Sequence, residues 1–191
     1  IDSVFFDLIK PYNDEMVKLL LKAREILEMA KKEPIMLEFD VEIDNTKPTS
    51  YQDILFNRNE LAYIQTEVKR LEKQYKELKT AQKLSHLDVF EPQIEMVGSQ
   101  GYLFMQVERE DMDILKAMID AIANRYATIV IFAVNLKEDG SVSFICRSNN
   151  PNVHAGYLVK QAATLSGGNG GGSPTFAQGG GKNSLHLEQI Q

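Results

Sequence analysis

The sequence contains a single cysteine, Cys146, among its 191 residues. It therefore offers neither an internal disulfide nor a metal site made of several cysteines. No apolar run approaches the roughly 20 residues that a membrane-spanning helix needs, and no signal peptide opens the chain. We expect a cytoplasmic protein that does not contact the membrane. The chain begins IDSVFFDLIKPYND without an initiator Met, which is typical of a piece cut from a longer protein.

Residues that enzymes use for catalysis are few and scattered. His86, His154 and His186 have no neighbouring carboxylate or cysteine in a recognisable catalytic or metal-binding spacing. We predict that Cys146, inside an apolar segment, is a core residue rather than a nucleophile. His154 is expected to cap a helix or lie on the surface. The sequence thus predicts no catalytic residue and no metal site in this chain.

Charge is distributed unevenly along the chain. The net charge of −6 argues against nucleic-acid binding by the whole surface. Residues 1–96 carry 14 Lys and Arg against 19 Asp and Glu. From Ser141 onward, Arg147, Lys160 and Lys182 face only Glu188. The C-terminal end is therefore mildly basic, which is compatible with a local phosphate contact.

The most unusual stretch is Ser166–Asn183, which reads SGGNGGGSPTFAQGGGKN and holds eight of the chain's twelve glycines. Glycine tolerates positive φ and allows another backbone or a phosphate to approach closely, and successive N–H groups can form an anion-binding concavity. We predict a structured loop here, because Pro174 and Phe176 separate two glycine triplets. Two alternatives stay open: a flexible Gly/Ser tether, and glycines that serve only close packing inside the fold.

The same stretch carries a family signature. Gly170-Gly171-Gly172, Pro174, Ala177-Gln178 and Gly179-Gly180 resemble the GGG-x-P-x-x-A-Q-x-GG signature that closes the C-terminal domain of alanyl-tRNA synthetases, a domain of the wider DHHA1 family. Phosphoesterase members of the family carry a histidine after the triplet, where this chain has Ser173. That departure points to the synthetase branch.

The resemblance implies a non-catalytic C-terminal region of an alanine–tRNA ligase. Such a region grips the outer corner of alanine-specific tRNA and helps to couple aminoacylation with editing. ATP and zinc are expected only in N-terminal domains that are missing here. The residues that match the motif or lie close to it form the candidate RNA-binding set: Gly170, Gly171, Gly172, Gln178, Gly179, Gly180, Lys182 and Asn183, with Arg147 and Lys160.

The N-terminal part reads as two helices around an alternating segment. Apolar spacing predicts helices over residues 12–32 and 50–84, the second capped by Ser50 with Asp53. Strict alternation predicts a half-buried strand over residues 35–43. The second helix carries an a/d seam that pairs either with the first helix or with a second copy in a homodimer: Leu61, Ile64, Val68, Leu71, Tyr75 and Leu78.

The sequence pattern of the C-terminal part predicts secondary-structure elements in the order β-β-α-β-β-α. Its expected strands are residues 94–97, 102–107, 128–134 and 142–147, and its helices begin at Asp111 and Val153. The second helix ends at Gly167, in a left-handed C-cap. The fold class is therefore α+β: a long helical or coiled-coil segment over residues 1–92, then a small α/β sandwich with a mixed sheet over residues 93–191.

Three other functions remain open from the sequence. The chain can be the tail of a free-standing alanyl-tRNA editing hydrolase, although the zinc-binding HxxxH and CxxxH pair of editing domains is absent. It can be a structural dimerisation module whose glycines only pack. A nucleotide phosphoesterase half is disfavoured by Ser173 and by the missing metal ligands.

Overall fold

The computed structural model of the chain describes residues 2–42 and 50–185. The chain divides into two compact units, residues 1–79 and 80–191, and the boundary falls within helix α2 (Tyr51–Ser85). Each unit has a hydrophobic core of its own.

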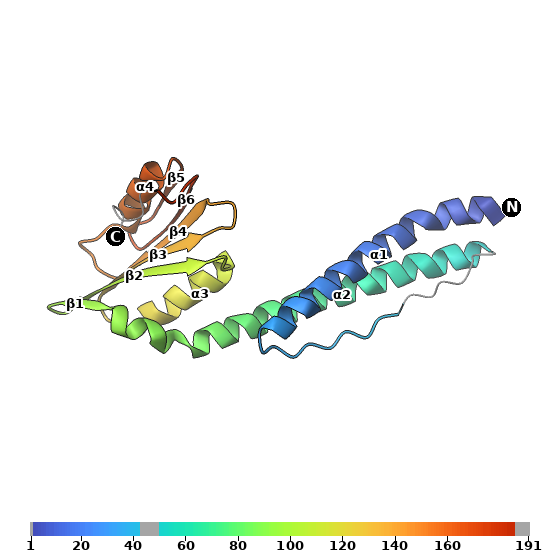
Figure 1. The fold of residues 1–191 in the computed structure, drawn as a ribbon, viewed down its shortest axis with the longest axis horizontal. Coiled ribbons are helices and arrows are strands. Elements are labelled where there is room, and N and C mark those ends of the chain that lie inside the picture. The colour runs from blue at the N-terminus through green and yellow to red at the C-terminus, as the bar shows by residue number, and fades with distance from the viewer. Residues whose placement is uncertain (1, 43–49, 186–191) are drawn as a thin grey trace. The chain divides into compact units, whose positions relative to one another are not determined.

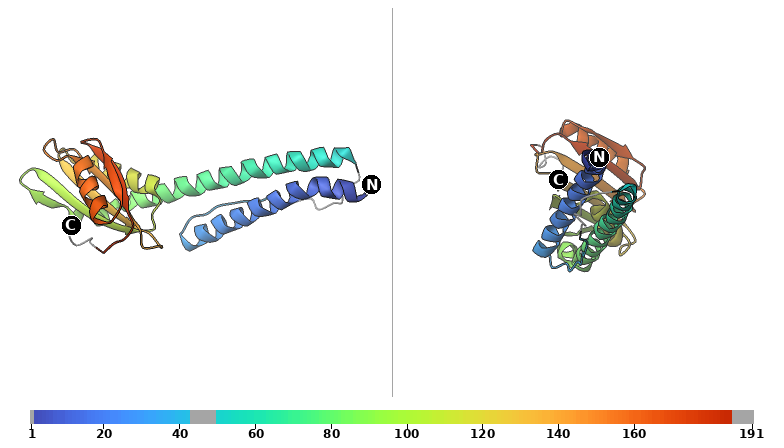
Figure 2. Two further views of the ribbon diagram at one scale, coloured as in Figure 1. Left: turned by 90° about the horizontal axis from the view of Figure 1, so that it is seen from above. Right: turned by 90° about the vertical axis from the view of Figure 1, so that its right-hand side faces the viewer.

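The first unit is built on a pair of helices that run side by side in the same direction (Figures 1 and 2). Helix α1 (Asp2–Lys32) begins well before the predicted residue 12 and contains Pro11. A proline inside a helix loses one backbone hydrogen bond. Here Ile9 and Met16, 2% and 0% exposed, lie on either side of Pro11, and their burial favours continuing the helix.

Helix α2 begins with the predicted cap. The Ser50 backbone N–H donates to Asp53 Oδ2 at 2.8 Å, and the Asp53 N–H donates to Ser50 Oγ at 3.4 Å. This reciprocal pair satisfies two N–H groups that the helix itself leaves unbonded.

The predicted a/d seam of α2 is buried against α1. Ile64, Val68 and Leu71 are at most 1% exposed and pack with Met16 and Ile26 of α1. Leu61 and Tyr75 lie partly buried in the same core, whereas Leu78 is 44% exposed. The seam therefore lies within one chain, and a second copy would have to displace α1 to reach it.

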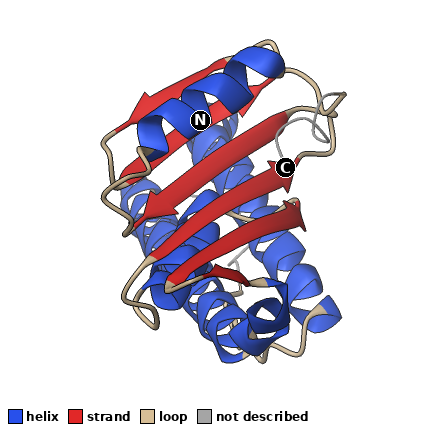
Figure 3. Ribbon diagram, turned by 90° about the vertical axis from the view of Figure 1, so that its left-hand side faces the viewer, coloured by secondary structure: helices blue, strands red, loops and turns tan. Residues whose placement is uncertain are grey.

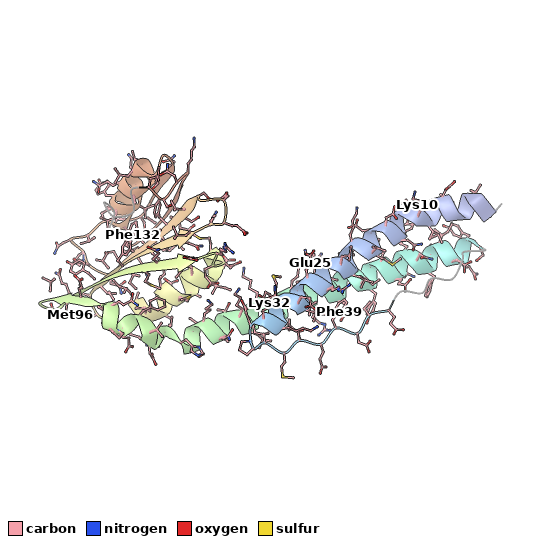
Figure 4. The ribbon with its side chains drawn as sticks, in the orientation of Figure 1. Lys10, Glu25, Lys32, Phe39, Met96 and Phe132 are labelled. Carbon is pink, nitrogen blue, oxygen red and sulfur yellow. The ribbon has the colours of Figure 1, made fainter. Side chains whose placement is uncertain are left out.

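The strand predicted at residues 35–43 is wrong for the residues that the structure describes. Residues 35–42 are extended but belong to no sheet in the described part of the chain, and Ile43 lies outside the described residues. Leu37, Phe39 and Val41 pack against the helix pair, while Met36 is 93% exposed (Figure 4 labels Phe39). The alternation is real, but it belongs to an extended segment whose inner side chains cover two helices.

The second unit is a mixed six-stranded sheet in the order β1-β2-β3-β4-β6-β5. β2 and β3 are parallel and are joined through helix α3, and the other neighbours are antiparallel. This confirms the predicted α+β class. The elements are the short 3-10 helix η1 (Leu87–Gln93), β1 (Glu95–Val97), β2 (Gln100–Glu108), α3 (Met112–Ala123), β3 (Ile129–Leu136), β4 (Val142–Ser148), α4 (Ala155–Leu165), β5 (Asn169–Gly172) and β6 (Phe176–Gly181).

The sheet has a core on each face, because successive strand residues point to opposite sides. On one side Leu103, Ile131 and Ile145 pack with α3, and on the other Val134 and Phe144 pack with α4. Figure 3 shows the sheet face-on with α4 in front of its upper strands. The continuous apolar run in β3 is explained by burial on both faces, as predicted.

The prediction of a glycine loop is also wrong, because most of this segment forms a β-hairpin. β5 and β6 pair antiparallel, and β6 also pairs with β4. Glycine has a low intrinsic propensity for β-strands. Here the tertiary packing decides the conformation. Gly167 ends α4 with a φ of 69°, so the predicted left-handed C-cap is confirmed.

The buried seam of α2 gives a direct stability test. We expect Leu71→Ala to destabilise the helical unit by about 2–5 kcal/mol, because it leaves a cavity between α1 and α2. Leu78→Ala, on the same helix but at a side chain 44% exposed, should cost about 0.5 kcal/mol or less. Urea unfolding followed by far-UV circular dichroism measures both, and equal losses would contradict the seam's burial.

Candidate nucleic-acid interface

The turn of the β5–β6 hairpin is fastened to the first turn of α4. The Ala155 N–H donates to the Pro174 carbonyl at 2.9 Å, and the Gly156 N–H donates to the Ser173 carbonyl at 3.1 Å. Ser173 also closes the turn itself, because its Oγ accepts from the Phe176 N–H at 3.1 Å. The N-terminus of α4 is thus occupied by carbonyl oxygens and is not an open anion site.

Glycines on one face of the hairpin are required by α4. A Cβ added at Gly170 or Gly179 would lie 2.8 or 2.7 Å from Val159 Cγ1. Gly172 and Gly181 face the same side, and a Cβ there would collide with Ala177 Cα at 2.6 Å or with the Ser166 carbonyl at 3.0 Å. Gly170 and Gly179 thus allow α4 to lie directly on bare backbone, whereas the collision at Gly172 is with the partner strand β6.

The opposite face of the hairpin is uncovered. A Cβ at Gly171 would meet nothing within 4 Å, and one at Gly180 would meet only the Val142 carbonyl oxygen, at 3.2 Å. Neither glycine has a positive φ. The register places Gly171 and Gly180 on one side with the exposed Gln178 and with Asn169. We call these four residues the open face; nothing in the described part of the chain requires glycine at 171, whereas the backbone of β4 crowds position 180.

One end of the open face carries an aromatic ring and cations. Phe176 is half-buried against the α3-side core, so its ring anchors its own segment. Lys116 Nζ of α3 lies 5.0 Å from the centre of its ring. Arg147 pairs with Phe176 across the strands and lies 3.4 Å from Asp120 Oδ1, although its Nε makes no hydrogen bond. Arg147 is therefore less available to phosphate than predicted.

The remaining predicted cations lie elsewhere around the hairpin. The Lys182 N–H donates to the Ser166 carbonyl at 2.7 Å, and its side chain is exposed just past β6. Asn183 lies beside Gly167, and Lys160 is exposed on α4. The structure therefore divides the predicted set between two faces of the hairpin. It also adds Lys116, which no local sequence signal connects to residues 60 positions later.

The hairpin and α4 lie in a segment without acidic residues. Residues 140–187 contain no Asp or Glu. Within the described range 80–185, Lys116, Lys160 and Lys182 form no ion pair, whereas Arg125 pairs with both Asp88 and Glu91. An anion that approaches the hairpin thus meets cations that are not already neutralised.

A separate cleft of about 580 Å³ lies between α4 and strands β2 and β3. Phe104 and Phe132 stack in its wall, with ring centres 6.2 Å apart (Figure 4 labels Phe132). Glu95 is the one acidic residue among those that line it, and no lysine, arginine or histidine lines it. The residues described hold no cluster of His, Cys, Asp or Glu suited to a metal ion, and none of the described helices is both long and apolar enough to cross a membrane.

His154 and Cys146 have structural surroundings. His154 occupies the N-cap position of α4, but its side chain makes no capping hydrogen bond and stacks on Tyr157 instead. Cys146 is fully buried, as predicted for a core residue. His186 lies outside the described residues.

The buried thiol should be inert. Burial raises the pKa of Cys146 from 9.0 to about 12. We expect Ellman's reagent to leave the native chain unmodified at pH 8 and to modify one thiol in denaturant. Because the folded pKa is raised, the stabilisation is complete below pH 9 and is lost as the pH rises towards 12. Rapid modification of the native chain would contradict this burial.

Two glycine variants separate the faces of the hairpin. Gly179→Ala should destabilise the second unit by about 1–3 kcal/mol, because the new methyl group overlaps Val159. Gly171→Ala adds the same methyl group into open space and should change stability by about 0.5 kcal/mol or less. Thermal unfolding measures both. A loss at Gly171 as large as that at Gly179 would contradict an uncovered face.

Comparison with known proteins places the second unit in a family. Residues 99–191 match the DHHA1 domain family. The chain is 33% identical over 133 residues to the alanine–tRNA ligase of Hydrogenovibrio crunogenus, covering 69% of this chain and 15% of the ligase. It is 29% identical over 185 residues to that of Onion yellows phytoplasma, covering 94% and 19%. The chain thus spans less than a fifth of these relatives' length.

Among solved structures, the C-Ala domain from Aquifex aeolicus alanyl-tRNA synthetase is similar with a TM-score of 0.46 and 24% identity, covering 51% of this chain and 89% of that domain. These sequence matches confirm the expected relationship. Residues 99–191 match the DHHA1 domain family, and the chain is similar to part of alanine–tRNA ligases.

Proposed function

We propose that this chain is a non-catalytic region of an alanine–tRNA ligase and that the open face of its hairpin binds the outer corner of alanine tRNA. One observation carries the proposal. Gly171 leaves backbone bare on a face where no contact within the described chain needs it. A side chain there would instead keep a ligand away from the backbone.

The chemistry of the open face suits folded RNA. Structured RNA is recognised largely through shape, stacking, and contacts to phosphate and 2′-hydroxyl groups. Bare strand backbone gives a flat surface for a ribose or a base. Gln178 adds an amide that both donates and accepts hydrogen bonds. Lys116 of α3 and Lys182 supply cations near this hairpin, and Lys182 lies in a segment, 140 to 187, without acidic residues.

In this proposal the chain holds tRNA while other parts of the ligase act on it. Aminoacylation, editing, and the ATP and zinc that they use belong to those other parts. By binding a fixed feature of the tRNA, the chain would keep the substrate attached while its acceptor end moves between the two reactions. Aminoacylation and editing are then coupled because the bound tRNA stays at a high effective concentration near both sites. The chain itself needs no catalytic residue.

Gly171→Val tests the open face directly. We expect it to weaken binding of alanine tRNA about tenfold or more, the loss typical of a central contact, without lowering the melting temperature. Lys182→Ala should weaken binding less. It should also lower the slope of log affinity against log salt concentration by the amount expected for about one phosphate contact. Fluorescence anisotropy of labelled tRNA across a salt series measures both.

Lys69→Ala provides a matched control. Lys69 is an exposed cation of α2 with no ion pair among the described residues, so its removal should leave affinity unchanged. Failure of the unaltered chain to bind alanine tRNA at low salt would overturn RNA binding. Full affinity in Gly171→Val would overturn the open face as the contact.

A further inference from the structure

Helix α4 presents an outward row of polar and aromatic side chains. Tyr157, Lys160, Gln161 and Thr164 are all exposed and follow the i, i+3, i+4, i+7 spacing of one helix face. Val159, Ala162 and Ala163 face inward, at most 3% exposed. α4 lies on the other side of the sheet from α3, so this row is separate from the open face.

The row begins with a prearranged aromatic pair. The rings of His154 and Tyr157 stack with centres 4.3 Å apart and planes 26° from parallel. Tyr157 is nevertheless 68% exposed, so one ring face rests on His154 while much of the ring meets solvent. Single exposed tyrosines are common on protein surfaces, but most are not held by a second ring.

Gly156 is what makes room for this pair. A Cβ at Gly156 would lie 2.9 Å from His154 Cε1 and 3.1 Å from the Gly172 carbonyl carbon. A side chain there would push the His154 ring away and lift α4 from the hairpin. The packing of α4 on the hairpin thus also fixes the platform on which Tyr157 lies.

We infer that this outer row of α4 is a second RNA contact, in which an unpaired base stacks on Tyr157 and Lys160 meets a neighbouring phosphate. The inference rests on the proposed RNA binding and adds a surface to it. Stacking on an aromatic ring is tolerant of base identity, because every base has a π-face. Holding the ring on His154 in advance lowers the ordering cost of binding.

The charge of the row favours RNA as the ligand. Lys160 lies one helical turn from Tyr157 and has no ion pair among the described residues. The segment from 140 to 187 contains no carboxylate, and Glu95 lines the adjacent cleft together with Gln161 rather than being part of the row. An aromatic ring beside an unneutralised cation is the usual arrangement for binding single-stranded nucleotides.

A tryptophan reporter tests the stacking. The chain has no tryptophan, so Tyr157→Trp provides a unique signal that keeps an aromatic ring at the site. We expect alanine tRNA to quench this fluorescence in proportion to binding. Tyr63→Trp is the control: Tyr63 is 56% exposed on α2 and belongs to the first unit, which carries none of the proposed contacts, and its signal should not change.

Affinity measurements complete the test. Tyr157→Phe should bind alanine tRNA like the unaltered chain, whereas Tyr157→Leu should bind roughly 5- to 150-fold more weakly through loss of stacking. If Tyr157→Trp binds tRNA without quenching, or Tyr157→Leu keeps full affinity, the second contact is overturned and the proposed function stands. If the unaltered chain binds no tRNA, both are overturned.

Discussion

The second unit depends on direct contact between helix α4 and the bare backbone of the β5–β6 hairpin. Val159 reaches between Gly170 and Gly179, where even a methyl group would not fit. Both ends of α4 are fastened to the same hairpin, since the turn carbonyls cap its first N–H groups and the Ser166 carbonyl accepts from Lys182. The glycines are therefore a packing requirement first, and they fix the helix, the turn and the sheet edge together.

That requirement has a consequence for binding. Strand geometry alternates sides, so a hairpin made of consecutive glycines is bare on both faces although α4 needs only one. Packing explains Gly170 and Gly179, and the Val142 carbonyl crowds Gly180, but Gly171 is left without an internal reason. The structural and the ligand-binding interpretations of the glycine segment are thus not alternatives. They apply to alternate residues of the same strands, and the sequence alone does not separate them, because separation requires knowing which side α4 occupies.

Elements whose signal is local could be predicted from the sequence, and those decided by distant contacts could not. The apolar run of β3, the spacing in α3 and the cap at Gly167 are each specified within a few residues. By contrast, glycine's weak strand propensity predicts a loop at β5 and β6, and only α4 and β4 override it. Alternation in residues 35–42 correctly predicts one buried side but not that helices cover it. Lys116 illustrates the same limit, since nothing near it in the sequence points to Phe176.

The uneven charge along the chain gives the two proposed RNA contacts a common electrostatic basis. Residues 1–96 hold 19 acidic against 14 basic side chains, so that part of the chain repels a polyanion. The hairpin and α4 lie in the segment that lacks carboxylates. Repulsion from that part of the chain disfavours RNA binding there. Repulsive contacts in wrong orientations raise specificity just as favourable contacts in the right orientation do. In the proposed function, a net negative protein can therefore bind tRNA selectively, because the segment of the hairpin and α4 contributes cations and no carboxylates, although Asp120 of α3 pairs with Arg147 beside the hairpin.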